Sequence, residues 1–498
     1  MANSNRRTEG KSFDPDANVP FRTGSAGFGK KLVLQKAFEG DWYGTLKAGA
    51  TELHVVFHLK RNPDGGYTGT LDSPDQGATG IPISEVVTEG QQITVRVATV
   101  QGEFVGTLTE DGKTLKGEWK QSGMSFPLEL RKDTPPPAPK RPQEPKPPFP
   151  YRTEEVTVIN PKAKVRLTGT LTLPTGKPPF PTVILLTGSG AQNRDEEIFG
   201  HKPFLVLADY LTRRGFATLR MDDRGVGGST GDMSEATTLD FAEDALAAMT
   251  YLKSRREIDP KRIGLLGHSE GALVATIAAA RSQEVAFIVL LAGTGVPGEQ
   301  ILFRQAELIA RKSGVPDNAI ERNRLLQGRV FEILRREPDN EKAAKQIAEA
   351  LVANLARGTL PEAQRQALES QARNYTRPWF RVFIDLNPAE YLRKVKCPVL
   401  ALWGANDLQV DPAQNMPAVE KALKAGGNKR FTLRKLPGLN HLFQKSDTGL
   451  PTEYAKIKET FNPDALKLIG DWLQSVTKPP TAPPKVSITK PARKPRRP

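Results

Sequence analysis

The sequence has few of the features that mark disulfide-linked, metal-binding or membrane-spanning proteins. Its 498 residues include one cysteine, Cys397, so no disulfide can form within the chain. The apolar residues Val399 and Leu400 that follow it indicate a buried thiol. No apolar run is long enough to span a bilayer, so we expect no integral membrane protein. Two of the five histidines, His54 and His58, lack a third ligand, so we expect ordinary strand residues and no metal site.

Both ends of the chain read as unstructured. Residues 1–8 lack the apolar core of a signal peptide, and the Gly-rich stretch 24–29 predicts a joint, so 1–29 is interpreted as a flexible leader or an expression remnant. Residues 478–498 are Pro-rich and basic without an acid, which predicts disorder. Part of the net charge of +15 lies there. A solvated tail is favoured over contact with an anionic surface, and we expect no nucleic-acid partner.

The length predicts roughly three domains. Residues 30–133 alternate apolar and polar positions with period two, and Gly-containing turns separate the runs. This pattern predicts an antiparallel all-β module, a barrel or a sandwich, with Trp42, Tyr67 and Trp119 filling its interior. The Pro-rich stretch 134–150 predicts a semi-rigid linker that forms no core of its own.

Beyond the linker, strands and helices alternate, which predicts a doubly wound, mostly parallel α/β sheet. Residues 151–295 form its first part and 388–477 its second. Helical periodicity in 296–387 predicts an inserted cap. An antiparallel pair is expected at 156–158 and 165–173. The other expected strands are 182–186, 216–221, 263–266, 286–291, 399–402 and 431–436; the helices are 204–213, 239–253, 417–425 and 465–476.

The chain is organised around the segment Gly267-His268-Ser269-Glu270-Gly271. A buried strand precedes it and a helix of small residues follows. This context favours a nucleophile elbow, in which Ser269 occupies a strained turn and the two glycines leave out side chains that would collide. The N–H of Glu270 is placed to bind an oxyanion. An ordinary Gly-rich turn is the alternative.

A serine nucleophile requires a base and an acid. His441 follows the last predicted strand on a loop, where a base belongs, whereas His201 precedes the nucleophile and His268 lies inside the elbow. Asp407 lies between Ser269 and His441, which matches the order serine, acid, histidine. Alternatively, Asp407 caps a turn.

The second oxyanion donor is expected in the loop after strand 182–186. Its sequence is TGSGAQNRDE (187–196), and we assign the donor to the N–H of Ser189, with Gly190 as second choice. A phosphate-binding loop is disfavoured, because the pattern lacks the Lys-Ser/Thr ending of a P-loop. In the cap, Trp379 and Phe380 belong to an aromatic cluster that forms either cap core or a substrate-binding wall.

Six motifs in order resemble the EstD-like bacterial α/β-hydrolases, which are labelled carboxylesterases or serine aminopeptidase-like proteins. The likeness covers about 151–476. It implies Ser269 as nucleophile, Asp407 as acid and His441 as base. Relatives with a similar β module are generally secreted, which implies a secreted or periplasmic protein, although the sequence shows no signal peptide. The motifs are TGSGAQNRDE (187–196), RMDDRGVGGSTG (220–231), GHSEG (267–271), PWFR (378–381), DLQV (407–410) and LNHLF (439–443).

These residues favour a carboxylesterase that transfers the acyl group of a small ester to Ser269 and then to water, without a cofactor. The alternatives are a peptidase or amidase that uses the same triad and, in another class, a non-catalytic binding protein on a hydrolase scaffold. The sequence shows no clear anionic pocket for an amino terminus, although Glu196 or an acid of the cap could serve. Subunit pairing through the β module, giving a homodimer, stays open.

Overall fold

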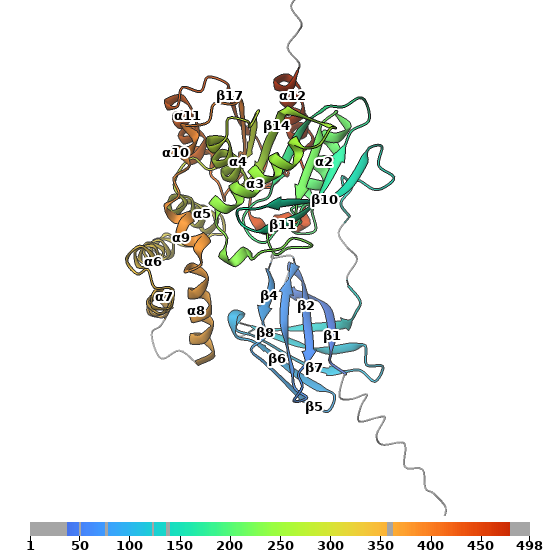
Figure 1. Cartoon of the computed structure of the whole chain (residues 1–498). Coiled ribbons are helices and arrows are strands. Elements are labelled where there is room, and N and C mark those ends of the chain that lie inside the picture. The colour runs from blue at the N-terminus through green and yellow to red at the C-terminus, as the bar shows by residue number, and fades with distance from the viewer. Residues whose placement is uncertain are drawn as a thin grey trace, which may run out of the picture.

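The structure is a computed structural model that describes residues 37–48, 51–74, 78–121, 124–135, 140–355 and 362–478. The leader predicted at 1–29, and the basic tail after residue 478, lie outside the described residues. Figure 1 shows two units, an all-β unit in blue and cyan and a larger unit of strands and helices.

The N-terminal unit is a curled antiparallel sheet, a half-barrel, which confirms the predicted all-β module. In the described residues it has nine strands in the order β4-β3-β2-β1-β9-β8-β7-β6-β5. Trp42, Tyr67 and Trp119 are buried in its interior, as expected. The strands are β1 (Gly40–Ala48), β2 (Thr51–Arg61), β3 (Tyr67–Ser73), β4 (Ala78–Pro82), β5 (Glu85–Glu89), β6 (Gln92–Val97), β7 (Gly102–Leu108), β8 (Thr114–Gln121) and β9 (Met124–Lys132).

The larger unit is built on a sheet that, in the part of the chain described, has eight strands in the order β10-β11-β13-β12-β14-β15-β16-β17. β10 to β11 and β11 to β13 are antiparallel, and every later neighbour is parallel, which confirms the predicted mostly parallel sheet. The strands are β10 (Arg152–Asn160), β11 (Val165–Leu173), β12 (Phe180–Leu186), β13 (Ala217–Met221), β14 (Ile258–His268), β15 (Ile288–Leu291), β16 (Val399–Gly404) and β17 (Phe431–Leu436).

The strand order reverses at β12, because the chain moves from β12 to β13 on one side and later to β14 on the other. Such a switch point leaves a crevice at the carboxyl ends of the strands, where ligands bind in α/β sheets. Strands β13, β15 and β16 are buried along their whole length, as in a sheet covered on both faces. The functional site is therefore expected at the ends of β12 and β14.

Helices connect the parallel strands, and one more helix follows the last strand. They are α2 (Pro203–Arg213), α3 (Thr238–Lys253), α4 (Glu270–Arg281), α10 (Pro388–Leu392), α11 (Pro412–Ala425) and α12 (Pro463–Thr477). The predicted start of α11 at Pro417 is wrong, because α11 begins five residues earlier. Asp411 caps it by accepting the N–H of Ala413, and Pro412 is placed where a helix needs no N–H donor, so Pro417 lies inside the helix.

The inserted helices between β15 and β16 pack around a core of their own. They are α5 (Gly298–Lys312), α6 (Asp317–Arg336), α7 (Asn340–Leu355), α8 (Glu362–Tyr375) and α9 (Pro378–Asp385). Phe331 and Ile347 lie at the centre of this core, which is separate from the core around the large sheet. Figure 1 shows the five helices grouped beside the sheet unit. Because the insertion begins at the carboxyl end of β15, its first and last helices lie near the strand ends that carry the site.

The Pro-rich segment is attached to the larger unit where the structure describes it. The guanidinium of Arg141 is buried and donates hydrogen bonds to the main-chain carbonyls of Phe199, Gly200, Ala455 and Ile457. Gln143 bonds the main chain at Thr460 and Phe461. Residues 140–150 therefore form part of the surface of the larger unit.

Candidate active site

Ser269 lies between the end of β14 and the start of α4, with φ 53° and ψ −116°. A positive φ is costly for a residue with a side chain, so the surrounding structure must hold this turn. It leaves no room for larger residues: a Cβ at Gly267 would lie 1.9 Å from the carbonyl oxygen of Gly271, and one at Gly271 would lie 2.0 Å from that of Leu186. The strained elbow expected from the sequence is therefore present.

Helix α4 directs its N-terminal end at Ser269. The N–H of Ser269 donates to the carbonyl of Leu291 on β15, which fixes the turn against the neighbouring strand. The N–H of Glu270 belongs to the first turn of α4, whose N–H groups have no partner within the helix. The positive end of the helix dipole therefore faces the region around the serine hydroxyl.

Asp407 and His441 come together from the loops after β16 and β17. His441 Nδ1 is 2.9 Å from Asp407 Oδ2, and both side chains are buried. The other oxygen, Asp407 Oδ1, accepts the N–H groups of Gln409 and Val410 at 2.8 and 2.9 Å. Asp407 thus both caps a turn and holds the imidazole. Because a carboxylate accepts, Nδ1 carries the proton and Nε2 is left as the basic nitrogen.

His441 lies against the elbow. Its ring centroid is 4.7 Å from that of His268, the residue before Ser269. Among the described residues, the Ser269 hydroxyl forms no hydrogen bond with His441. Such bonds are often long in unliganded enzymes and tighten when substrate binds. The structure therefore brings the three predicted residues to adjacent loops at one edge of the sheet.

The loop after β12 carries the predicted oxyanion donors Ser189 and Gly190. Asp223, which follows β13, accepts the hydroxyl of Thr187 and the N–H of Gln192, both at 2.9 Å. The N–H of Gly188 is already used, because it donates to Glu196 Oε1 at 2.7 Å. Ser189 and Gly190, the latter with φ 98°, stay the candidates for the second donor.

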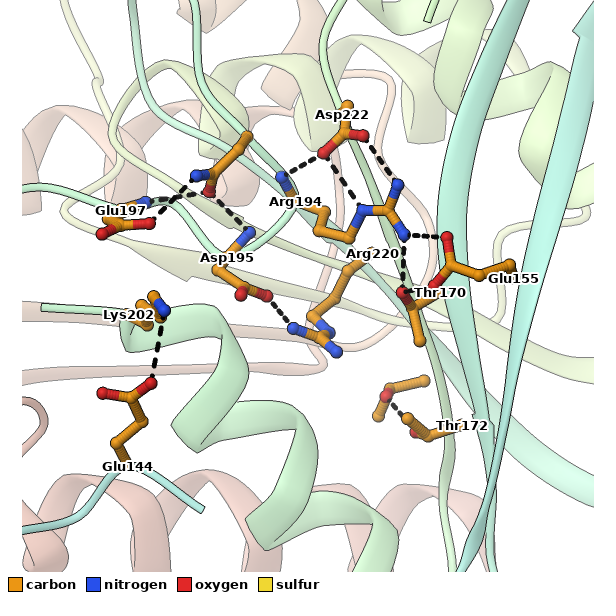
Figure 2. A network of polar contacts seen from close by, with 12 residues as sticks. Glu144, Glu155, Thr170, Thr172, Arg194, Asp195, Glu197, Lys202, Arg220 and Asp222 are labelled. Atoms are coloured by element: carbon orange, nitrogen blue, oxygen red, sulfur yellow. Dashed lines mark hydrogen bonds and ion pairs between the residues drawn. The ribbon is translucent and has the colours of Figure 1, made fainter. Parts of the chain in front are cut away.

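Two arginine–aspartate pairs hold the loop at Arg194 and Asp195 (Figure 2). The guanidinium of Arg194 bonds both oxygens of Asp222, and its main-chain N–H donates to the same carboxylate at 2.8 Å. Burial opposes ionisation of Asp222, but Arg194 outweighs it and lowers the pKa of that carboxyl. The neighbouring Asp195 pairs with Arg220, which is buried on β13. The loop is therefore fixed to the sheet by charge-assisted hydrogen bonds.

The two aromatic residues predicted to bind substrate make different contacts. Trp379 Nε1 donates to Glu270 Oε1 at 2.6 Å, and its ring stacks on Phe383 with centroids 4.8 Å apart. Phe380 instead packs against Phe331 and Tyr375 in the cap core. Trp379 thus joins the cap to the residue that follows the nucleophile, whereas Phe380 holds cap helices together.

A small cavity of about 50 Å³, open to solvent, lies beside the oxyanion loop. Gly188, Gly190, Asp223, Phe241 and Glu270 are among its lining residues. Burial raises the pKa of Asp223 to about 7, and the nearby carboxyls of Glu270 and Glu196 add to this rise. Burial also raises the pKa of Glu270. The sequence reasoning missed both side chains as features of the site, although the position of Asp223 just after a parallel strand was an available signal.

The remaining histidines have other partners. His201 is buried and bonds the main-chain carbonyl of Tyr454 and the hydroxyl of Thr460. His58, on β2, lies between Asp41 and Asp72. Across the described ranges no group of three or more His, Cys, Asp or Glu residues is arranged to hold a metal ion. In the same ranges no helix is both long and apolar enough to cross a membrane.

Comparisons with known proteins show the family of the fold. A family model described as the alpha/beta hydrolase fold matches residues 181–444, more than half of the chain. Esterase EstD of Thermotoga maritima is 25% identical over 291 residues, which cover 58% of this chain and 61% of EstD. The chain thus spans less than two thirds of that relative.

Two further proteins, one compared by sequence and one by structure, are similar to this chain. An uncharacterised 31.7 kDa protein from the traX-finO intergenic region of Escherichia coli is 27% identical over 232 residues, covering 45% of this chain and 74% of that protein. A solved structure of the Pyrococcus furiosus esterase Pf2001 has a TM-score of 0.40 and 18% identity, covering 69% of this chain and 99% of that one.

Proposed function

Because this chain belongs to the alpha/beta hydrolase fold family, we propose that it is a serine carboxylesterase that hydrolyses small carboxylic esters through an acyl-enzyme on Ser269. One observation carries the proposal. Ser269 occupies a strained turn at the start of a buried helix. At the same carboxyl end of the parallel strands, His441 Nδ1 lies 2.9 Å from Asp407 Oδ2. The similarity to an esterase supports the same class of substrate.

The arrangement can perform each step of acyl transfer with the chain's own residues. His441 Nε2 takes the proton of the Ser269 hydroxyl as its oxygen attacks the ester carbonyl, and Asp407 orients the ring and stabilises the imidazolium. The N–H groups of Glu270 and of Ser189 or Gly190 stabilise the oxyanion. His441 then returns the proton to the departing alcohol oxygen, and a water molecule releases the acid by the same steps.

A second candidate is a peptidase or amidase that uses the same triad, and the cavity beside the oxyanion loop favours it. An aminopeptidase needs a group that binds the substrate's ammonium. Asp223 and Glu270 both line the cavity. Within the part of the chain that the structure describes, their carboxyls form hydrogen bonds to Thr187, Gln192, Thr238 and Trp379 rather than ion pairs with a basic side chain. A substrate amine in this cavity would be attracted by these carboxyls once they are ionised.

Comparison of p-nitrophenyl acetate with alanine p-nitroanilide separates the two candidates. We expect the ester to be hydrolysed with a kcat/KM at least about tenfold above that of the anilide, because an alcohol leaves more readily than an amine. A faster anilide reaction would replace the esterase proposal by the aminopeptidase. If the wild-type chain turns over neither substrate and a fluorophosphonate does not label it, the hydrolase proposal is contradicted.

A further inference from the structure

A buried ion pair that the acyl-transfer steps do not use lies directly behind the triad. His268 Nδ1 is 2.9 Å from Glu196 Oε1, and the two side chains are 7% and 4% exposed. Glu196 comes from the loop after β12, and His268 is the last residue of β14. Removing one member of a buried pair leaves an uncompensated charge, which destabilises the fold around the pair.

Both partners of the pair also bond the main chain of a loop that carries site residues. His268 Nε2 is 2.9 Å from the main-chain oxygen of His441. Glu196 Oε1 accepts the N–H of Gly188, which precedes the candidate oxyanion donors, at 2.7 Å. The chain of contacts Gly188–Glu196–His268–His441 therefore connects the oxyanion loop to the loop of the base and passes through the residue next to Ser269.

The bonding partners define the protonation of His268. A carbonyl oxygen can only accept, so Nε2 carries a proton. Burial lowers the pKa of His268, but the charge and hydrogen bond of Glu196, the carbonyl of His441 and the charge of Asp407 outweigh it, and the pKa is raised. Nδ1 faces Glu196 Oε1 and Nε2 faces the carbonyl of His441, each at 2.9 Å, an arrangement that an imidazolium satisfies by donating from both nitrogens.

We propose that Glu196 and His268 are positioning residues that fix the oxyanion loop and the His441 loop at the separation that acyl transfer requires. This proposal rests on the proposed function of Ser269. Neither side chain is assigned a contact with substrate, so neither is a catalytic residue. A displacement of reacting groups by about 1 Å can cost 10²-fold in rate. The Glu196–His268 pair contacts each loop at or next to a residue of the candidate site, Gly188 on one loop and His441 on the other.

The test uses three single variants that preserve size. His268→Gln places an amide nitrogen near the position of Nε2, His268→Asn places one near Nδ1, and Glu196→Gln removes the negative charge. His201→Gln serves as the control, because His201 is also buried and makes two hydrogen bonds, but to Tyr454 and Thr460. The full-length chain is used throughout, with p-nitrophenyl acetate as substrate and a trifluoromethyl ketone as transition-state analogue.

We expect each of the three site variants to lower kcat by about 10–100-fold with KM changed less than about threefold. The affinity for the ketone should fall by the same factor as kcat/KM, because both depend on the oxyanion donors. The Glu196→Gln/His268→Gln double variant should lose little more than either single variant, since the residues act as one unit. His201→Gln should keep kcat within about twofold.

A melting temperature that falls while kcat and ketone affinity stay near wild type would show a merely structural pair and overturn the proposal. Equal losses in the His201→Gln control would overturn it as well. If the His268 variants do not fold, Glu196→Gln and ¹⁵N NMR of the wild-type ring provide the test: we expect both nitrogens of His268 protonated at neutral pH, and a singly protonated ring would contradict us. Failure of the proposed function is distinguishable, because the wild-type chain would then show no turnover.

Discussion

Substitution of Asp407 tests most directly whether His441 needs an acid partner to act as the base. In Asp407→Asn the amide keeps the size of the carboxyl but no longer selects the tautomer that leaves Nε2 basic. We therefore expect kcat to fall on the order of 10³–10⁴-fold, with little change in melting temperature. Asp411→Asn is a suitable control, because Asp411 caps α11 and pairs with Arg304. Near-wild-type turnover in Asp407→Asn would move the acid role to another residue.

Asp223 should make the stability of the chain depend on pH. Its pKa is raised from an ordinary 3.8 to about 7 by burial, so the folded chain binds this proton more tightly than the unfolded chain does. The carboxyl therefore lowers the unfolding free energy as pH rises from about 4 to 7, by on the order of 2–4 kcal/mol at about 1.4 kcal/mol per pKa unit. Asp223→Asn has no proton to lose and should be free of this contribution.

The measurement is urea denaturation of both proteins between pH 5 and pH 8. The unfolding free energy of Asp223→Asn relative to that of the wild-type chain should increase from pH 5 to about pH 7 and level off above that. A constant difference across the range would show that Asp223 titrates normally.

At the scale of residues, the order of Ser269, Asp407 and His441 along the chain was enough to predict that they meet, because the fold class fixes which loops are adjacent. The structure brings Asp407 to His441, and the roles of the three residues stay a proposal. Glu196 and His268 could not be paired in this way. They are 72 residues apart, and their contact depends on β12 and β14 being neighbours. Alternating strands and helices do not specify that order.

At the scale of elements, helix α9 should contribute to substrate choice through one of its three aromatic residues, Trp379. Trp379 bonds Glu270 beside the nucleophile, so Trp379→Ala should change the preferred acyl length among p-nitrophenyl esters. Phe380 packs in the cap core, so Phe380→Ala should lower the unfolding free energy by roughly 1–3 kcal/mol and slow all esters alike. Identical acyl profiles in both variants would show that α9 only holds the cap together.

The bounds of individual elements were predicted with unequal accuracy among both strands and helices. The expected strand 431–436 has the bounds of β17, because the glycines at 426–427 before it and the Pro-Gly turn at 437–438 after it mark both ends. The start of helix α11 was predicted five residues late, because the capping residue Asp411 and the first-turn proline Pro412 were not used as the start signal. The predicted resemblance to EstD-like hydrolases and the α/β-hydrolase fold are both confirmed by the comparisons.

At the scale of the whole molecule, we propose that the β module is not needed for chemistry on small esters. The residues of the candidate site all lie in the larger unit, and Arg141 and Gln143 attach the end of the Pro-rich segment to that unit. A chain that begins at Lys140 should therefore hydrolyse p-nitrophenyl acetate like the full-length protein. A chain that begins at Tyr151 lacks both anchors and should have a lower melting temperature.

Loss of activity in a soluble, folded chain beginning at Lys140 would show that the module shapes the active site directly. Alternating positions predicted the strands of this module and its buried aromatic residues. They could not distinguish a barrel, a sandwich or a half-barrel, because closure depends on how strands far apart in sequence curl toward each other. Subunit pairing, attachment or delivery of a large substrate are roles we propose for it.

The central claim is that Ser269 carries the acyl group, and one labelling measurement tests it most directly. The full-length chain is reacted with a fluorophosphonate, and its intact mass and peptide map are recorded beside those of Ser269→Ala. We predict one adduct per chain, located on Ser269, together with loss of both labelling and p-nitrophenyl acetate hydrolysis in Ser269→Ala, whose fold should be unchanged. Stoichiometric labelling or turnover that survives in Ser269→Ala would contradict the account.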